Sequence, residues 1–127
     1  SNIQRTPYSG RNFEYYSEDG FLSGMICAYE TSAMESHGLY VYNKHIGLND
    51  QEDLRRGICT WANEQSIREI YMRAFELPIT IAGTAYTTPD GEDVTMQGAS
   101  CVMLAFNRIG VVCRRGFAPT SCAMNAV

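Results

Sequence analysis

The sequence predicts an α+β domain, a small antiparallel β-barrel of the oligosaccharide/oligonucleotide-binding (OB-like) type with a helical segment between its strands. Three observations support this fold class. Short stretches typical of strands lie on both sides of the middle of the chain. Apolar residues at helical spacing, preceded by capping signals, occupy the middle itself. Strands and helices do not alternate in this order, which excludes repeated βαβ units.

Length and composition fit one globular domain. The chain has 127 residues, 45% of them hydrophobic and 19% charged, which is enough for a single core and too short for two. We expect one domain over 1–127, with an N-terminal arm at 1–20, the barrel with its helix at 21–115, and a tail at 116–127.

Two strands are expected before the helical segment. The apolar run Met25–Tyr29 predicts a buried strand over 21–30. Leu39 and Val41 alternate with tyrosines and predict a second strand over 38–45. The polar residues between these stretches would join them as a hairpin.

Two capping boxes mark the helical segment. Asn49–Glu52 has the pattern of a helix start, and apolar residues at helical spacing continue to Asn63. Ser66–Glu69 is a second such pattern, followed by a new apolar stripe. The sequence therefore predicts two helices, or one kinked helix, ending near Leu77–Pro78.

Strand signals return after the helices. Apolar residues alternate with polar or small ones at 79–82 and again at 94–96. The strong turn signal Thr88–Gly91 lies between these stretches, so the sequence predicts a hairpin. A further strand pair is expected at 101–106 and 109–113.

Cysteine spacing in that last pair predicts a disulfide. Cys101 and Cys113 lie at equal distances from Asn107 and would face each other across a hairpin. Dispersed cysteines in a short chain are typical of an oxidising compartment, so we expect a secreted protein. The pairing of Cys27, Cys59 and Cys122 stays open.

Charge and spacing exclude several partners. The net charge is −4 and the ten cations are scattered, so no basic stripe exists for nucleic acid. No apolar stretch approaches the roughly 20 residues of a membrane span, so no membrane insertion is expected. The cysteine and histidine spacings do not match zinc sites, and we expect no metal and no cofactor.

Catalysis has one candidate set. Glu35, His37, Lys44 and His45 are close in sequence and could serve a small secreted ribonuclease toxin as acid and base groups. Neighbouring polar residues on a loop are more often simply solvated. We therefore expect a binding protein with no catalytic residues rather than an enzyme.

Several patches carry a family resemblance. Asn12–Asp19 resembles the amino-terminal segment of the sugar-binding B subunits of subtilase cytotoxin and related pertussis-like AB5 toxins. Ser66–Phe75 and the strand expected after it are similar to the central helix and following strand of that family. Gln97–Cys101, with Cys113 and Gly116–Pro119, resembles the family's closing strand and terminal disulfide.

The resemblance implies a function and a site. It implies a secreted subunit that binds sialylated cell-surface glycans, forms a ring of five and delivers a catalytic A subunit. Ser17 would bond the carboxylate or glycerol chain of sialic acid, while Tyr16 or Tyr15 stacks on the sugar. The helical segment also has apolar residues on two different faces, more than one small barrel can cover. This favours a closed homo-oligomer, most simply a pentamer. The alternative is a periplasmic immunity or inhibitor protein that binds a partner enzyme.

Overall fold

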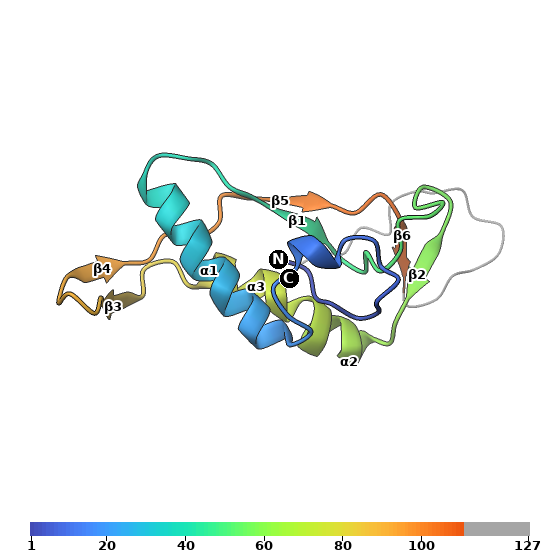
Figure 1. Ribbon diagram of the computed structural model, residues 1–127, viewed down its shortest axis with the longest axis horizontal. Helices are drawn as coiled ribbons and strands as arrows, with labels where there is room; N and C mark the ends of the chain where they lie inside the picture. Colours follow the sequence, from blue (N-terminus) through green and yellow to red (C-terminus); the bar gives the residue numbers. More distant parts are fainter. Residues whose placement is uncertain (111–127) are drawn as a thin grey trace.

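The computed structural model describes residues 1–110 of the chain. A long helix and two short strands precede a helical segment, and four more short strands follow it (Figure 1). In chain order the elements are the 3₁₀ turn η1 (Asn12–Glu14), α1 (Gly20–Ser36), β1 (Tyr42–Ile46), β2 (Cys59–Trp61), α2 (Glu64–Ser66), the π-helical turn η2 (Ile67–Tyr71), α3 (Arg73–Thr80), β3 (Ala85–Thr87), β4 (Asp93–Thr95), β5 (Cys101–Leu104) and β6 (Arg108–Gly110).

The strands form three separate pairs. β1 pairs with β5 and β2 with β6, both in parallel, while β3 and β4 are antiparallel. The chain passes from β1 to β5 through α3, so these elements make a parallel crossover unit. The expected exclusion of βαβ units is therefore wrong. Residues 1–110 contain no closed barrel, and the OB-like barrel stays a prediction.

The predicted strand over 21–30 is instead part of helix α1. Asp19 caps this helix, because its side chain accepts a hydrogen bond of 2.7 Å from the Leu22 amide. The face that α1 buries consists largely of small residues, so an apolar stripe at helical spacing does not stand out in the sequence. These buried residues are Gly20, Ser23, Gly24, Cys27, Ala28, Thr31 and Ser32.

Small residues let α1 approach α3 closely. A Cβ atom built on Gly24 would lie 2.7 Å from Cδ1 of Leu77 and 2.9 Å from the carbonyl oxygen of Arg73. On Gly20, it would lie 2.4 Å from the carbonyl oxygen of Ile70. Glycine at these positions thus fixes how near the two helices lie (Figure 1).

The helical segment begins later than predicted. Residues 49–58 form a loop, and the helix starts at Glu64, where Asn63 accepts a hydrogen bond of 2.7 Å from the Ser66 amide. The Asn49–Glu52 pattern is not a cap, since no helix follows it and Glu52 instead pairs with the distant Arg11 and with nearby Arg55. The second predicted helix is confirmed and runs through η2 and α3 to Thr80.

The structure has one late hairpin, but the predicted first strand at 79–82 is wrong, because Ile79 and Thr80 end helix α3 and the strand begins at Ala85. β3 and β4 pair around the predicted turn, and this hairpin projects from one end of the molecule (Figure 1). β5 and β6 do not pair with each other, because each joins a strand from the first half of the chain.

The predicted disulfide does not fit this arrangement. Cys101 lies beside Tyr42 of β1 and has a free thiol, while Cys113 lies outside the described residues. Cys27 is also a free cysteine, whereas Cys59 is disulfide-bonded.

The core lies between β1 and the helices that follow it. Its buried members are Ile3, Ile46, Leu48, Tyr71, Ala74 and Phe75. Ile3 brings the N-terminal segment into this core, and Asn2 fixes it there by donating hydrogen bonds to the carbonyl oxygens of His45 and Gly47 at 3.1 and 2.9 Å. This packing holds the N-terminal segment against the end of β1, where the polar residues described next lie.

Candidate functional site

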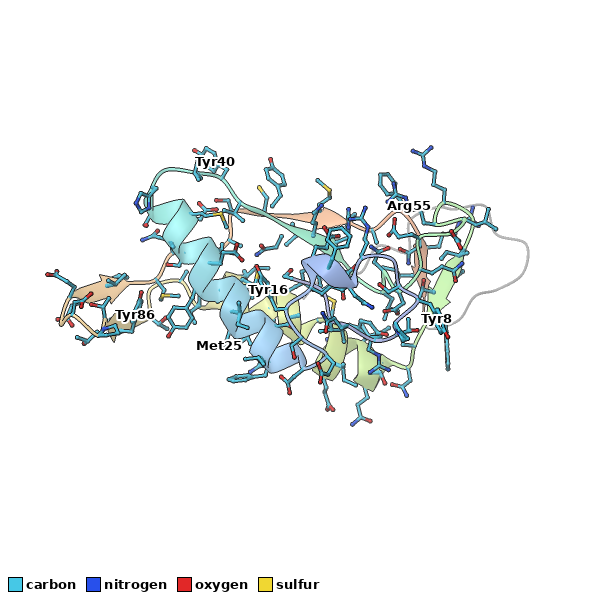
Figure 2. All side chains as sticks on the ribbon, in the orientation of Figure 1. Tyr8, Tyr16, Met25, Tyr40, Arg55 and Tyr86 are labelled. Carbon is cyan, nitrogen blue, oxygen red and sulfur yellow. The ribbon has the colours of Figure 1, made fainter. Side chains whose placement is uncertain are left out.

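The residues expected to bind sialic acid do not converge on one pocket. Tyr15 is only 6% exposed, and its hydroxyl donates a hydrogen bond of 3.3 Å to the Asn49 carbonyl. Ser17 is 8% exposed, and its hydroxyl oxygen accepts a bond of 3.1 Å from the Asp19 amide. Tyr16 is 38% exposed and bonds Glu30 of α1 (Figure 2). These contacts join the N-terminal segment to its neighbours.

The ribonuclease set is divided between two places. Glu35, near the end of α1, accepts bonds from Ser100 and from the Val41 amide, which together hold the pKa of its carboxyl below the usual value. Nδ1 of His37 lies 2.8 Å from the Ala33 carbonyl oxygen. Lys44 and His45 instead lie on β1, in a second group of charged residues.

We call that second group the strand-end cluster: Arg11, Glu14, Lys44, His45 and Glu52. Arg11 bridges its two carboxylates, with Nη1 2.5 Å from Glu14 and Nε 2.7 Å from Glu52. Lys44 Nζ lies 3.4 Å from the other oxygen of Glu14. Residues from η1, β1 and the loop after β1 are thereby held together, with the side chains of Arg11, Glu14 and Glu52 largely buried.

His45 is the most buried member of the cluster. It is 4% exposed, and its Nδ1 atom has no hydrogen-bond partner. Burial, and then the charges of Arg11 and Lys44, lower the pKa of the imidazole, so it is neutral at neutral pH. A buried polar atom without a partner is costly in a native fold and marks a place where a ligand can supply one.

Both carboxylates of the cluster are bound by cations. Burial alone would raise the pKa of Glu14, but the hydrogen bonds and charges of Arg11 and Lys44 outweigh it and lower that pKa. Glu52 accepts bonds from Arg11, Arg55 and Asn49. Both acids therefore act as fixed acceptors that orient the cations around them.

Buried amides fix the backbone around the cluster. Asn107, just after β5, donates bonds of 2.8 Å to the Leu48 carbonyl and to the Thr60 hydroxyl. Its Oδ1 atom has no partner. Asn49 donates to Tyr15 as well as to Glu52. The ends of the parallel strands β1 and β5 are joined in this way.

A hollow of about 450 Å³ adjoins the cluster. It is lined by Glu52, Leu54, Arg55, Arg56, Gly57 and Ile58 of the loop after β1. The guanidinium carbons of Arg55 and Arg56 lie 4.7 and 5.4 Å from the centroid of the Phe106 ring. Figure 2 shows Arg55 at the end of the molecule that carries β2 and β6.

This arrangement is suited to a polar ligand with many hydroxyl groups. Cations held by carboxylates, a neutral imidazole and an aromatic ring lie at the carboxyl ends of two parallel strands, where α/β sheets bind their ligands. Among residues 1–110 no group of three His, Cys, Asp or Glu side chains could hold a metal ion. No helix in this part of the chain is long and apolar enough to cross a membrane. The fold is thus a parallel crossover with a polar cluster at the carboxyl ends of its strands.

Known proteins with similar sequences are beta-glucosidases. The chain is 34% identical over 108 residues to a probable beta-glucosidase I of Aspergillus flavus, a match that covers 85% of this chain and 11% of the relative. It is 47% identical over 76 residues to beta-glucosidase A of Butyrivibrio fibrisolvens, covering 60% of this chain and 9% of the relative. No family model matches the chain.

A solved structure shares the fold. The crystal structure of a selenomethionine-labelled beta-glucosidase from Kluyveromyces marxianus aligns with a TM-score of 0.71 and 32% sequence identity, over 86% of this chain and 11% of that one. The chain therefore spans about a tenth of the length of the relatives it matches.

These similarities overturn the toxin interpretation. The relatives and the structural neighbour are named beta-glucosidases, not B subunits of AB5 toxins. The expectations of a toxin subunit, of sialylated-glycan and A-subunit partners with a pentameric ring, and of a protein that is no enzyme were wrong. The immunity-protein and ribonuclease alternatives fall with them. The roles given to Ser17, Tyr16 and Tyr15 thereby lose their basis, because they came from that resemblance.

Sequence reasoning missed most of the strand-end cluster. The sequence places Arg11 in an extended arm and Glu52 in a helix cap, and it favours solvated positions for Lys44 and His45. One usable signal was the Arg11–Glu14 pair, because opposite charges three residues apart meet on a helical turn. No local pattern indicates that Glu52, far away in sequence, completes the bridge.

Proposed function

We propose that this chain supplies part of the glycoside-binding site of a beta-glucosidase-type glycoside hydrolase. The relatives provide the reaction class, and one observation supports the location: the buried, unpartnered Nδ1 atom of His45 lies in a cluster with Lys44 and Arg11 at the end of a parallel strand. Polar ligands of open α/β sheets bind at such ends.

Each member of the strand-end cluster has a role in holding the sugar. Sugar hydroxyls donate and accept hydrogen bonds, and bonds to charged groups are the strongest that they form. Lys44 and Arg11 donate to hydroxyl oxygens, and neutral His45 bonds one hydroxyl through Nδ1. Glu14 and Glu52 hold the cations in place before the sugar arrives, which lowers the entropic cost of binding.

The cluster orients the substrate and does not transfer the proton. Glycoside hydrolysis ordinarily uses two carboxyl groups, one of which is protonated and acts as the acid. Arg11 and Lys44 lower the pKa of Glu14, so Glu14 cannot be that acid at neutral pH, while both oxygens of Glu52 are occupied by hydrogen bonds from Arg11 and Arg55. We therefore assign the acid and the nucleophile to residues outside this cluster.

Calorimetric titration of the chain with nitrophenyl β-D-glucoside tests the proposal. Lys44→Met removes a charged donor and is expected to weaken binding about tenfold, with the circular-dichroism spectrum unchanged. Arg68→Met is the matched control, because Arg68 is exposed and its ion pair is with nearby Glu64. An intact parent chain that binds no β-glucoside, or equal binding by parent and Lys44→Met, would refute the assignment.

We also propose that the chain matures in an oxidising, secretory environment. The disulfide bond of Cys59 supports this, because such bonds persist where thiols are not kept reduced. Peptide mass mapping of the natively expressed protein should find Cys59 oxidised. A free Cys59 thiol in freshly isolated protein would contradict this proposal.

A further inference from the structure

We propose that the outer face of helix α1 is an internal interface of a larger beta-glucosidase-type enzyme, covered there by an apolar helix from another part of the same polypeptide. The inference concerns this surface and does not depend on where the glycoside binds. It follows from the side chains that α1 presents away from α3.

Helix α1 is apolar on two opposite faces. Its small residues pack against α3 and η2 (Figure 1). The opposite face carries large apolar side chains at helical spacing, each between 40% and 56% exposed. We call these four residues the outer stripe: Phe21, Leu22, Ile26 and Tyr29. Met25 is half-buried beside them (Figure 2).

The charges of α1 lie away from the outer stripe. The helix holds two charged side chains, Glu30 and Glu35. Glu30 accepts the Tyr16 hydroxyl at one border of the stripe, and Glu35 accepts the Ser100 hydroxyl near the end of the helix. A surface helix ordinarily carries charged residues on its outer face, whereas a helix that is apolar all round is buried. α1 therefore has the composition of a helix that is packed on both sides.

Aromatic contacts mark the two ends of the outer stripe. At one end, the guanidinium carbon of Arg73 lies 6.0 Å from the centroid of the Phe21 ring. At the other end, the rings of Tyr29 and Tyr86 meet edge to face, with 5.2 Å between their centroids. The helix rises about 12 Å from Phe21 to Tyr29, which is the length of about two turns of a partner helix.

The similar proteins indicate what covers the stripe. The structural neighbour shares the fold over 86% of this chain but over only 11% of its own length. The relative from Aspergillus flavus has the same proportion. Parallel strands such as β1 and β5 belong to sheets whose faces are covered by helices. A helix of the same enzyme is therefore favoured over a second copy of this chain.

Thiol labelling tests this inference in the natively expressed, full-length enzyme that contains this segment. Leu22→Cys and Ile26→Cys place thiols on the outer stripe, and Gln65→Cys places the control thiol at an exposed position of α2. In the enzyme, a maleimide should modify the stripe thiols at least about tenfold more slowly than the control, because packed sites react only when they open. In the 127-residue chain, all three thiols should react at similar rates. Peptide mass mapping separates these sites from the free thiols of Cys27 and Cys101.

A photo-cross-linker identifies what covers the stripe. Replacing Phe21 with p-benzoylphenylalanine keeps an aromatic ring there. In the full-length enzyme, this ring should cross-link to an apolar segment of the same polypeptide outside residues 1–127. That result, together with slow labelling, would support the inference.

Four other outcomes would overturn the inference. Fast labelling of the stripe in the full-length enzyme would show that nothing covers it. Protection of the stripe in the 127-residue chain, or a cross-link to residues 111–127, would make this chain's own C-terminal segment the cover. Protection that is lost on dilution would indicate a second copy. A native protein no longer than this chain would have no other helix to supply. All of these readouts are independent of β-glucoside binding, so they leave the proposed function to its own test.

Discussion

The imidazole of His45 and the ring of Phe106 lie 6.4 Å apart between their centroids, so the ends of β1 and β5 meet at one place. His45 belongs to the strand-end cluster, and the ring of Phe106 makes cation–π contacts with Arg55 and Arg56 of the hollow. Residues separated by about sixty positions in the sequence thus form one polar surface. The predictions that follow test the elements that build this surface.

The pKa of His45 predicts how stability depends on pH. The folded protein holds this imidazole neutral with a pKa below its ordinary value of 6.5, whereas the unfolded chain titrates near 6.5. Between those two values the unfolded state binds more protons. The free energy of unfolding should therefore fall as the pH drops below 6.5.

Urea unfolding at several pH values measures this effect. His45→Gln removes the titrating group, so the decline between pH 6.5 and the folded pKa should become shallower. His37→Gln is the control, since His37 is exposed at the end of α1. Parallel pH profiles for the parent and His45→Gln would show that His45 titrates alike in both states.

Gly24 should be intolerant of a methyl group. A Cβ atom there would lie 2.7 Å from Leu77 Cδ1 and 2.9 Å from a backbone oxygen that cannot turn aside. Gly24→Ala should therefore force α1 away from α3 and cost about 1 to 3 kcal/mol in urea unfolding. Gly57→Ala, whose Cβ would meet nothing nearer than 3.5 Å, should change stability little. Equal stabilities would mean that the helices are not this close.

Substitutions at Asp19 test whether residues 20–36 form a helix. Its side chain accepts the Leu22 amide at the first turn, and losing an N-cap typically costs about 1 kcal/mol. Asp19→Ala should lower stability by that amount, while Asp19→Asn, which keeps an acceptor oxygen, should retain most of it. A buried strand in this region would respond alike to both substitutions.

α1 also shows why the fold was only partly predictable from the sequence. The helix that the sequence predicts from Ser66 to near Pro78 is present within Glu64–Thr80, because bulky apolar residues recur there at helical spacing. The sequence predicts a strand in place of α1 because the buried face of this helix is made of Gly24 and other small residues. A strand in place of α1 gives an element order that fits a barrel, and that order agrees with the fold of the toxin subunits that the short sequence patches resemble.

The site was less predictable than the fold because its contacts are long-range. The Asn49–Glu52 pattern satisfies every local criterion for a helix cap, yet Glu52 binds Arg11, which is 41 residues away. Pattern rules evaluate neighbours along the chain, and the distant partner decided the outcome. The burial of His45 likewise depends on packing by the N-terminal segment.

Arg11 offers the most direct test of the strand-end cluster. Its guanidinium donates from Nη1 to Glu14 and from Nε to Glu52, and so bridges two carboxylates. Such a bridge requires the planar, forked arrangement of donors that arginine has. Lysine keeps the charge but cannot hold both acids in one geometry. Arg11→Lys should therefore weaken binding of nitrophenyl β-D-glucoside about tenfold, because Lys44 is no longer positioned through Glu14. Arg68→Lys, at an exposed pair, should bind as the parent does. If Arg11→Lys kept full affinity, positive charge alone would suffice at this position and the bridge would have no role in positioning the ligand.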